Sequence, residues 1–409
     1  MKMKKVILCF MLLALVGILA ACNRNGDTPA EATPTPPPAE TPAPTPEPTA
    51  EPDADADETA NDVEEAAGLR IAIVTSSSGI DDGSFNQNNF EGIQTFLATS
   101  PDSYYRFTRD YTGAPANAIS AVEQIVAEVD VVVMPGFQFG GIGQVALDNP
   151  DTYFILIDAH PAEVNGITEF PNVRAMLFAE QESGFLAGIA AAMETQTGLV
   201  AFVGGTAIPP VVNYQFGFES GVNFANTHLG TSAELVNLAP FAGTDVTGAN
   251  VGGNYVGGFA DVPTGLVIGE ALLAEGADII FVAAGMSGNG VFTAVMQDDS
   301  GAMVIGVDVD QYLQGYSGDR NIVLTSALKV MDLNVFRALV SIAEGNFVSG
   351  NYVMTAETNS TGVVTTHGRH QMSDATVDAI NDLFSQVMTG TIVPAANFNG
   401  HQPDNFPGL

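Results

Sequence analysis

Short aliphatic runs that alternate with helix-like stretches constrain the fold of this chain more than any other feature of its sequence. The runs resemble strands buried on both faces of a sheet, and they lie at residues 69–75, 104–107, 130–134, 153–157, 199–203, 278–283, 302–307 and 322–325. Stretches with apolar residues at helical spacing lie at residues 116–128, 182–194, 265–275, 290–297 and 330–343. This alternation predicts an α/β protein with parallel sheets.

The alternating region leaves two architectures open. Residues 69–409 are too many for one small sheet, so they form either two doubly wound domains or a single closed barrel, and the strand count does not separate the two. In open sheets, ligands bind beyond the carboxyl ends of the strands, and two such domains can face a common cleft. Candidate site residues are therefore expected at strand ends.

The first residues look like a targeting signal. Three lysines among the first five residues precede an uncharged apolar run at residues 6–21, which is short for a spanning helix but typical of a signal peptide. The run ends in Leu19-Ala20-Ala21-Cys22, which resembles the lipobox of bacterial lipoproteins. We expect residues 1–21 to be cleaved and Cys22 to carry lipid; a plain secretory signal and an uncleaved anchor helix are the alternatives. Cys9 lies in the cleaved part, so no disulfide is expected.

Residues 22–68 have a composition that cannot form a core. Pro, Thr, Ala and acidic residues dominate this stretch, and such segments stay unfolded because they have too little apolar surface to bury. A Pro-rich linker extends about 3.1 Å per residue, so this one could reach on the order of 100 Å from a membrane. We interpret it as a tether.

Net charge excludes one class of function. The chain has 47 Asp plus Glu against 12 Lys plus Arg, and its formal net charge is −35. Nucleic-acid binding depends on Lys and Arg that neutralise phosphates, so nucleic-acid binding is excluded and polyanionic ligands are disfavoured.

The polar loop after the first aliphatic run contains an aromatic residue. Phe85 stands beside Asp82, Ser84 and Asn86, which would suit a flat ligand that stacks on the ring while polar groups bind its edges. A hydrophobic staple, in which Phe85 packs on its own helix, explains the same residue equally well.

Three further residues follow other predicted strands. Asp158 follows the run at 153–157 and Asp308 follows the run at 302–307; carboxylates at such ends suit the hydroxyls of a sugar, although Asp158 could instead cap a helix. Lys329 is the one lysine outside the predicted signal peptide. Its position between a predicted strand and a predicted helix indicates that an ammonium group is needed there, to bind a ligand or to pair with a carboxylate.

Catalytic and metal-binding patterns are weak. The five histidines are scattered and the chain has neither HExxH nor Gly-x-Ser-x-Gly. His367 and His370 have no further candidate ligands nearby in the sequence. We expect no enzyme activity, no metal and no cofactor.

Several motifs resemble, in order and spacing, those of the basic membrane protein family, the substrate-binding lipoproteins of ABC importers that include the purine nucleoside receptors of bacteria. The motifs are Ile80-Asp-Asp-Gly-Ser-Phe-Asn-Gln87, Pro171-Asn-Val-Arg-Ala175, Phe185-Leu-Ala-Gly188, Val203-Gly-Gly205, Ile208-Pro-Pro-Val211, Gly217-Phe-Glu-Ser-Gly221, Gly276-Ala-Asp-Ile-Ile280, Gly306-Val-Asp-Val-Asp-Gln311 and Thr325-Ser-Ala-Leu-Lys329. The resemblance runs from about residue 69 to at least residue 343.

This resemblance implies a type I periplasmic-binding-protein fold, with two doubly wound parallel-sheet domains joined by a hinge of three crossovers. The N-terminal lobe would span residues 69–178 with about 309–340 returning to it, and the C-terminal lobe residues 179–308 with about 341–409. A nucleoside, with a purine nucleoside preferred, would be enclosed between the lobes and delivered to ABC permease and ATPase subunits. The protein would be a monomer on the extracytoplasmic face of the cell membrane.

The resemblance also assigns roles to residues. Phe85 would stack on the base, with Asn86 and Asp82 in the same loop; Asp158 would face the cleft; Asp308 and Lys329 would bind the ribose hydroxyls; and Tyr214 would complete the base sandwich. Two departures lie near the cleft: Ser76 stands where the family commonly has Asp, and Gly285-Met-Ser-Gly288 replaces Gly-Gly-Thr-Gly. Residues 241–253 match nothing in the family and are interpreted as a surface loop.

Rival interpretations remain at this point. The same fold could serve a surface sensor, or bind a sugar or another small polar solute. A nucleoside-hydrolysing enzyme would need a carboxylate cluster placed for acid-base work, or a metal.

Overall fold

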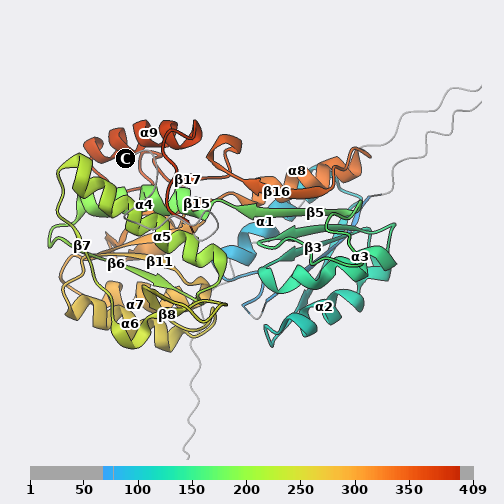
Figure 1. Ribbon diagram of the computed structural model, residues 1–409, viewed down its shortest axis with the longest axis horizontal. Coiled ribbons are helices and arrows are strands. Elements are labelled where there is room, and N and C mark those ends of the chain that lie inside the picture. Colours follow the sequence, from blue (N-terminus) through green and yellow to red (C-terminus); the bar gives the residue numbers. More distant parts are fainter. Residues whose placement is uncertain (1–67, 77, 397–409) are drawn as a thin grey trace, which may run out of the picture. The chain divides into compact units, whose positions relative to one another are not determined.

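The computed structural model describes residues 68–76 and 78–396 (Figure 1). The predicted signal peptide, Cys22 and residues 22–67 of the predicted tether lie outside the described residues. Within the described residues, no helix combines the length and the apolar character that crossing a membrane requires.

The first sheet has six strands, all paired in parallel, in the order β16-β5-β4-β3-β1-β2. Its strands are β1 (Arg70–Thr75), β2 (Tyr104–Arg109), β3 (Val131–Pro135), β4 (Tyr153–Ile157), β5 (Val173–Phe178) and β16 (Gly350–Met354). Five of these strands come from the first half of the body, whereas β16 returns from near its end.

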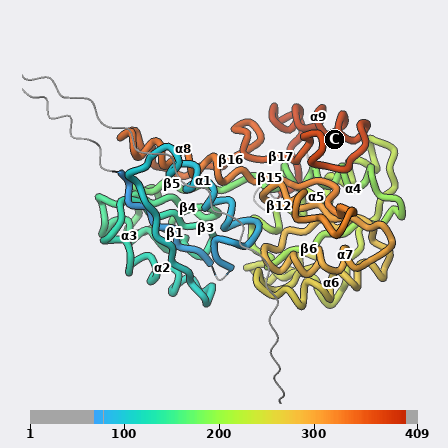
Figure 2. The backbone as a smooth tube through the Cα atoms, turned by 180° about the vertical axis from the view of Figure 1, so that it is seen from behind, coloured from blue at the N-terminus to red at the C-terminus, as the bar shows by residue number. Residues whose placement is uncertain are grey.

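Both faces of the first sheet are buried, which explains the unbroken aliphatic runs of its central strands. Ile71 and Ile73 of β1 face a core shared with α1 (Phe85–Thr99) and α8 (Met331–Ala343). Ala72 and Val74 face the opposite core, which is shared with α2 (Pro115–Glu123) and α3 (Gly143–Asp148). The helices α1 and α8 are far apart in the sequence but lie side by side (Figure 2).

The second sheet runs in the order β10-β6-β11-β12-β15-β17, with β7 paired to β6. All its pairs are parallel except β15 with β17. Its strands are β6 (Leu199–Gly204), β7 (Glu234–Leu235), β10 (Asn254–Tyr255), β11 (Ile279–Ala283), β12 (Met303–Asp308), β15 (Val323–Lys329) and β17 (Thr361–Val363).

Helices cover both faces of the second sheet as well. One core contains residues of α4 (Glu180–Glu194), α5 (Pro209–Phe224) and α9 (Asp374–Met388). The other core contains residues of α6 (Val262–Ala274) and α7 (Gly288–Gln297). The molecule therefore has two doubly wound α/β lobes, as the sequence predicts, and is not a closed barrel.

Short elements complete the described chain. Two small antiparallel hairpins are formed by β8 (Gly243–Thr244) with β9 (Asn250–Gly252) and by β13 (Tyr316–Ser317) with β14 (Arg320–Asn321). The short 3₁₀ helices are η1 (Val126–Glu128), η2 (Phe137–Ile142), η4 (Ala239–Phe241), η5 (Gly285–Ser287), η6 (Tyr312–Gly315) and η7 (Ala356–Thr358). The remaining element, η3 (Ala225–Leu229), is a wider π-helical turn that continues α5.

The chain passes between the sheets three times, from β5 into α4, from β15 into α8 and from β16 into η7. The first turn of α4 bonds to the other two crossings. Ser183 Oγ donates to Leu328 O over 2.7 Å, and Ala356 N donates to Glu182 Oε2 over 2.7 Å. These bonds place the start of α4 at the centre of the hinge.

The segment that returns to the first lobe differs from the predicted one. Residues 309–340 were expected in the first lobe, but β15 pairs with β12 in the second sheet. The strand that joins the first sheet is β16, which pairs with β5. Consecutive strands joined by a short connection stay in one sheet, and residues 309–322 form such a connection. The returning segment is therefore α8 with β16. The predicted division between residues 178 and 179 is kept as a proposal.

Candidate functional site

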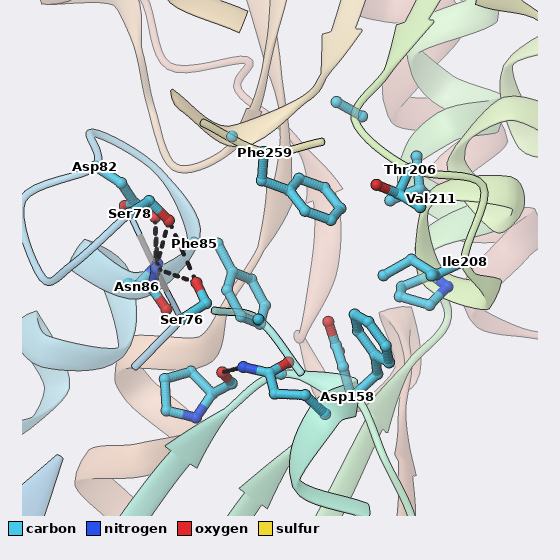
Figure 3. A pocket seen from close by; sticks show the side chains of 18 of the residues that line it. Ser76, Ser78, Asp82, Phe85, Asn86, Asp158, Thr206, Ile208, Val211 and Phe259 are labelled. Atoms are coloured by element: carbon cyan, nitrogen blue, oxygen red, sulfur yellow. Dashed lines mark hydrogen bonds between the residues drawn. The ribbon is translucent and has the colours of Figure 1, made fainter. Parts of the chain in front are cut away.

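A pocket of about 360 Å³ is lined by residues that follow strand ends of both sheets (Figure 3). The structure brings all nine predicted ligand residues into its wall: Ser76, Asp82, Phe85, Asn86, Asp158, Tyr214, Gly285, Asp308 and Lys329. Their common position follows from the parallel topology, because the carboxyl ends of parallel strands lie at one edge of a sheet. Their roles in binding stay predictions.

Asp82 organises the loop before α1. Its Oδ1 accepts hydrogen bonds from Ser84 N and Gln87 N, each over 3.1 Å, and its Oδ2 accepts from Asn86 N over 3.1 Å. Burial raises the pKa of Asp82, and these hydrogen bonds oppose that rise. The carboxylate thus binds free N–H groups at the start of α1 and holds the residues on either side of Phe85.

Asn86 has a fixed orientation in the pocket wall. Its Nδ2 lies 2.9 Å from Asp82 Oδ2, 3.1 Å from Ser78 Oγ and 3.3 Å from Ser76 Oγ. Because an ionised carboxylate only accepts hydrogen bonds, the amide nitrogen must face Asp82. The buried Oδ1 has no donor among the described residues, so it can accept one from a ligand.

Phe85 is the first residue of α1, and its ring points into the pocket (Figure 3). The ring also packs against the core beneath α1. Lys329 Nζ lies 5.2 Å from the centroid of the ring, within range of a cation–π contact. Phe259 also lines the pocket, and the two rings offer apolar surfaces to a flat ligand.

Lys329 is 2% exposed and lies between two carboxylates. Its Nζ is 2.6 Å from Asp158 Oδ1 and 2.8 Å from Glu180 Oε1, and Glu180 Oε2 accepts a hydrogen bond from Asn213 Nδ2 over 3.0 Å. Burial alone would lower the pKa of Lys329, but the neighbouring carboxylates Asp158, Glu180 and Asp308 raise it. The ammonium is therefore charged and firmly held.

Burial acts in the opposite sense on the carboxyl groups. It raises the pKa of Glu180 to about 7 although Lys329 opposes the rise, and it also raises the pKa of Asp158. One ammonium cannot compensate all the buried carboxylates around it, so the site is negative or holds a proton.

Asp308 is held from both lobes. Ser84 Oγ donates to its Oδ2 over 2.7 Å, and Tyr214 Oη donates to its Oδ1 over 3.2 Å. Burial raises the pKa of Asp308 to about 6. Asp308 and Asp158 both have left-handed backbones, with φ of 66° and 63°, and such strained non-glycine residues cluster at functional sites. Asp158 pairs with Lys329 and is not a helix cap.

The sequence analysis missed Glu180, Phe259 and Gln138. Glu180 follows β5, which the aliphatic pattern failed to predict, and Phe259 lies in a Gly-rich segment without periodicity. Gln138 lines the pocket from η2. The sequence motifs could not identify Glu180 as a partner of Lys329, because the two residues meet only in the folded protein.

The arrangement suits a flat, uncharged molecule with hydroxyl groups. Carboxylate oxygens and one ammonium can bind hydroxyls, aromatic rings can stack on a base, and an added phosphate would meet the excess of carboxylates. Among residues 68–76 and 78–396, no three His, Cys, Asp or Glu side chains gather where they could hold a metal ion.

Known proteins resemble this chain along most of the body. A family model described as "ABC transporter substrate-binding protein PnrA-like" matches residues 70–238 and 247–397. The "CD4+ T-cell-stimulating antigen" of Listeria monocytogenes is 30% identical over 300 residues, which cover 69% of this chain and 76% of that protein. The "ABC transporter nucleoside-binding protein BmpA" of Lactococcus lactis is 28% identical over 305 residues, covering 70% and 78% of the two chains.

Solved structures share the fold. An ABC transporter solute-binding protein from Aeropyrum pernix K1 superposes with a TM-score of 0.66 at 23% identity, covering 80% of this chain and 93% of that chain. A second one, from Conexibacter woesei, gives a TM-score of 0.59 at 19% identity, covering 80% and 99%.

Proposed function

This chain belongs to the PnrA-like family of ABC transporter substrate-binding proteins, as its motifs predict, and we propose that it captures a purine nucleoside between its lobes and delivers it to an importer. One observation carries the proposal. The pocket unites the Phe85 ring with Asp158, Asp308 and Lys329 in one wall, which matches the two chemical halves of a nucleoside.

Each half of a nucleoside has complementary groups in this pocket. The base would stack on Phe85 and donate to Asn86 Oδ1, which is buried and lacks a donor within the described chain. The ribose hydroxyls would donate to Asp308 and Asp158 and accept from Lys329. A relative from Lactococcus lactis carries the name of a nucleoside-binding protein, which supports this ligand class.

A thermal-shift screen of the purified protein tests the proposal. Nucleosides, free bases, nucleotides and common sugars are compared, since a ligand at 100 times its Kd stabilises the folded state by about 2.7 kcal/mol. We expect selective stabilisation by purine nucleosides. A response to a sugar alone, or silence from every nucleoside, would contradict the ligand assignment and leave the fold and family intact.

The charge of the site predicts discrimination against nucleotides. Asp158 and Asp308 line the pocket, and among the described residues the ammonium of Lys329 is the one cationic group that lines it with them. The carboxylates would therefore repel a phosphate. Calorimetry with a nucleoside and its monophosphate checks this selectivity. Equal affinities for the two ligands would defeat it.

The protein is further proposed to act without catalysis, as a lipoprotein anchored through Cys22 on the extracytoplasmic face of the membrane. Incubation with nucleosides should release no free base. Labelling with palmitate in the native cell should depend on Cys22, and Cys22→Ala should abolish it.

A further inference from the structure

Glu180 lies behind the wall of the candidate binding pocket. It is the first residue of α4 and is 1% exposed, and it is not among the residues that line the pocket. Its Oε1 lies 2.8 Å from Lys329 Nζ, on the side of the ammonium that faces the hinge. A ligand in the pocket would therefore touch Lys329 but not Glu180.

Lys329 has one N–H group left for a ligand. An ammonium carries three N–H groups. One of them is directed at Asp158 Oδ2 over 2.6 Å, and a second binds Glu180. The structure gives the third no acceptor within the described part of the chain. Because the two carboxylates come from different elements, they fix the orientation of the ammonium and present the third N–H group to a ligand.

Asp158 has a free acceptor in the pocket wall. Lys329 Nζ lies 2.6 Å from both of its oxygens, but the hydrogen bond is directed at Oδ2. Its Oδ1 is buried and accepts no hydrogen bond from the described residues. Because Asp158 lines the pocket, a ribose hydroxyl can donate to Oδ1.

The charge of Glu180 determines how well Asp158 can accept that hydrogen bond. When Glu180 is ionised, it shares the ammonium of Lys329 with Asp158. When Glu180 is protonated, the attraction of the ammonium is concentrated on Asp158. An ammonium lowers the basicity of a carboxylate that it pairs with, so Asp158 would then accept less strongly from a ligand.

Glu180 also supports a second residue of the pocket wall. Its Oε2 accepts a hydrogen bond from Asn213 Nδ2 over 3.0 Å. Asn213 precedes Tyr214, whose hydroxyl donates to Asp308 over 3.2 Å. The first residue of α4 thus holds both the end of β15 and the first turns of α5 in place.

Three charged or titratable groups from other elements face Glu180. They are Lys329 at the end of β15, Asp158 after β4 and Tyr214 on α5. Burial and Asp158 favour the protonated form of Glu180, whereas Lys329 and the bond from Asn213 favour the ionised form. The resulting pKa of about 7 means that the carboxyl exchanges its proton near neutral pH.

We infer that Glu180 is a positioning residue for nucleoside binding, whose negative charge shares Lys329 with Asp158 and so leaves Asp158 free to accept from a ribose hydroxyl. The ionised form then binds a nucleoside more tightly than the protonated form. Affinity therefore rises as pH rises through about 7 and levels off above it, and binding releases a proton. The inference rests on the proposed function, because it requires a ligand with hydroxyl donors.

Calorimetry at about pH 6 and about pH 8 tests the role of Glu180, with adenosine and inosine as probes. Glu180→Gln removes the charge at nearly constant size, so it mimics the protonated form. Glu194→Gln is the matched control. Glu194 is the last residue of α4, and its carboxylate accepts hydrogen bonds from Ser373 and Thr376, away from the pocket.

We expect the unmodified protein to bind both nucleosides at least about fivefold more weakly at the lower pH than at the higher. Glu180→Gln should bind about tenfold more weakly than the unmodified protein at about pH 8 and within about threefold of it at about pH 6. Glu194→Gln should follow the unmodified protein at both. A merely structural role of Glu180 would instead weaken binding by the same factor at both pH values.

A second measurement needs no variant. Calorimetry of the unmodified protein at about pH 7, in two buffers that differ in ionisation enthalpy, counts the protons exchanged on binding. We expect the release of about half a proton per nucleoside bound. This count decides the question if Glu180→Gln does not fold.

Two results would overturn the inference. In the first, the unmodified protein binds the nucleosides equally at both pH values and releases no proton. In the second, Glu180→Gln either leaves the affinity unchanged or lowers it by the same factor at both pH values. In both cases the nucleosides still bind, so the proposed function stands. If neither nucleoside binds the unmodified protein, the proposed function itself fails.

Discussion

At the scale of single residues, Phe85 is the side chain through which the base of a nucleoside would be held. Stacking on an aromatic ring is worth about 1–3 kcal/mol per base, so Phe85→Ala should weaken binding about tenfold or more. Calorimetry with guanosine or inosine measures the effect. Phe85→Leu, which keeps the apolar contact with the core beneath α1, separates loss of stacking from loss of packing; unchanged affinity in Phe85→Ala would contradict the stacking role.

Glu180 should make stability depend on pH. Burial raises the pKa of its carboxyl from 4.5 to about 7, so the folded state favours the protonated form. The resulting stabilisation is present below about pH 4.5 and is lost as pH rises toward about 7. Asp308, whose pKa burial raises from 3.8 to about 6, acts in the same sense.

We therefore expect that, as pH rises from about 5 to about 8, the melting temperature of Glu180→Gln falls by fewer degrees than the melting temperature of the unmodified protein. Melting curves at several pH values measure this slope. Glu234→Gln is a control, since Glu234 is exposed in β7. Parallel curves for Glu180→Gln and the unmodified protein would show that Glu180 does not titrate in this range.

At the scale of elements, the start of α1 depends on Asp82 more than on its own N-cap, because Ser84 makes no capping hydrogen bond. Asp82→Ala should lower the free energy of unfolding by about 1–2 kcal/mol. It should also weaken ligand binding, since Phe85 and Asn86 lose their support. Denaturant unfolding and calorimetry measure the two effects.

The neighbouring Asp81 provides the matched control for Asp82. Its side chain is 84% exposed and its ion-pair partner Arg109 is 3.7 Å away. Exposed pairs of this kind contribute little, so Asp81→Ala should leave both quantities nearly unchanged. Equal effects of the two substitutions would refute the capping role of Asp82.

Helices and strands were predicted correctly from the sequence where their apolar pattern matches their burial in the folded protein. The runs at residues 69–75 and 153–157 correspond to β1 and β4, which are buried between two helical layers. The helix α5 was missed because nearly all its residues are buried, so it has no polar face to give a helical period. The edge strand β16 was missed because it is half-exposed.

At the scale of the whole molecule, both lobes contribute to the pocket and bond to each other at its rim. Ser84 Oγ donates to Asp308, and Gln314 Nε2 donates to Gly83 O over 3.0 Å. A ligand that binds groups of both lobes favours the closed arrangement. Small-angle scattering should therefore give a smaller radius of gyration with saturating nucleoside than without it. Equal radii would count against closure.

The sequence by itself determined the α/β class, the family and the position of the candidate site at strand ends. Short aliphatic runs and strand-end motifs are local patterns, so they can be recognised without knowledge of the fold. The net charge likewise predicts that the protein does not bind nucleic acid, because the balance of Lys and Arg against Asp and Glu depends on composition alone.

Only the tertiary structure decided which groups meet. It paired Lys329 with Glu180 as well as Asp158, it placed the Asp82 carboxylate against the N–H groups at the start of α1, and it showed that the returning segment is α8 with β16. These outcomes depend on strand order and on contacts between residues far apart in the chain. No local pattern records such contacts, because they form only when the sheets assemble.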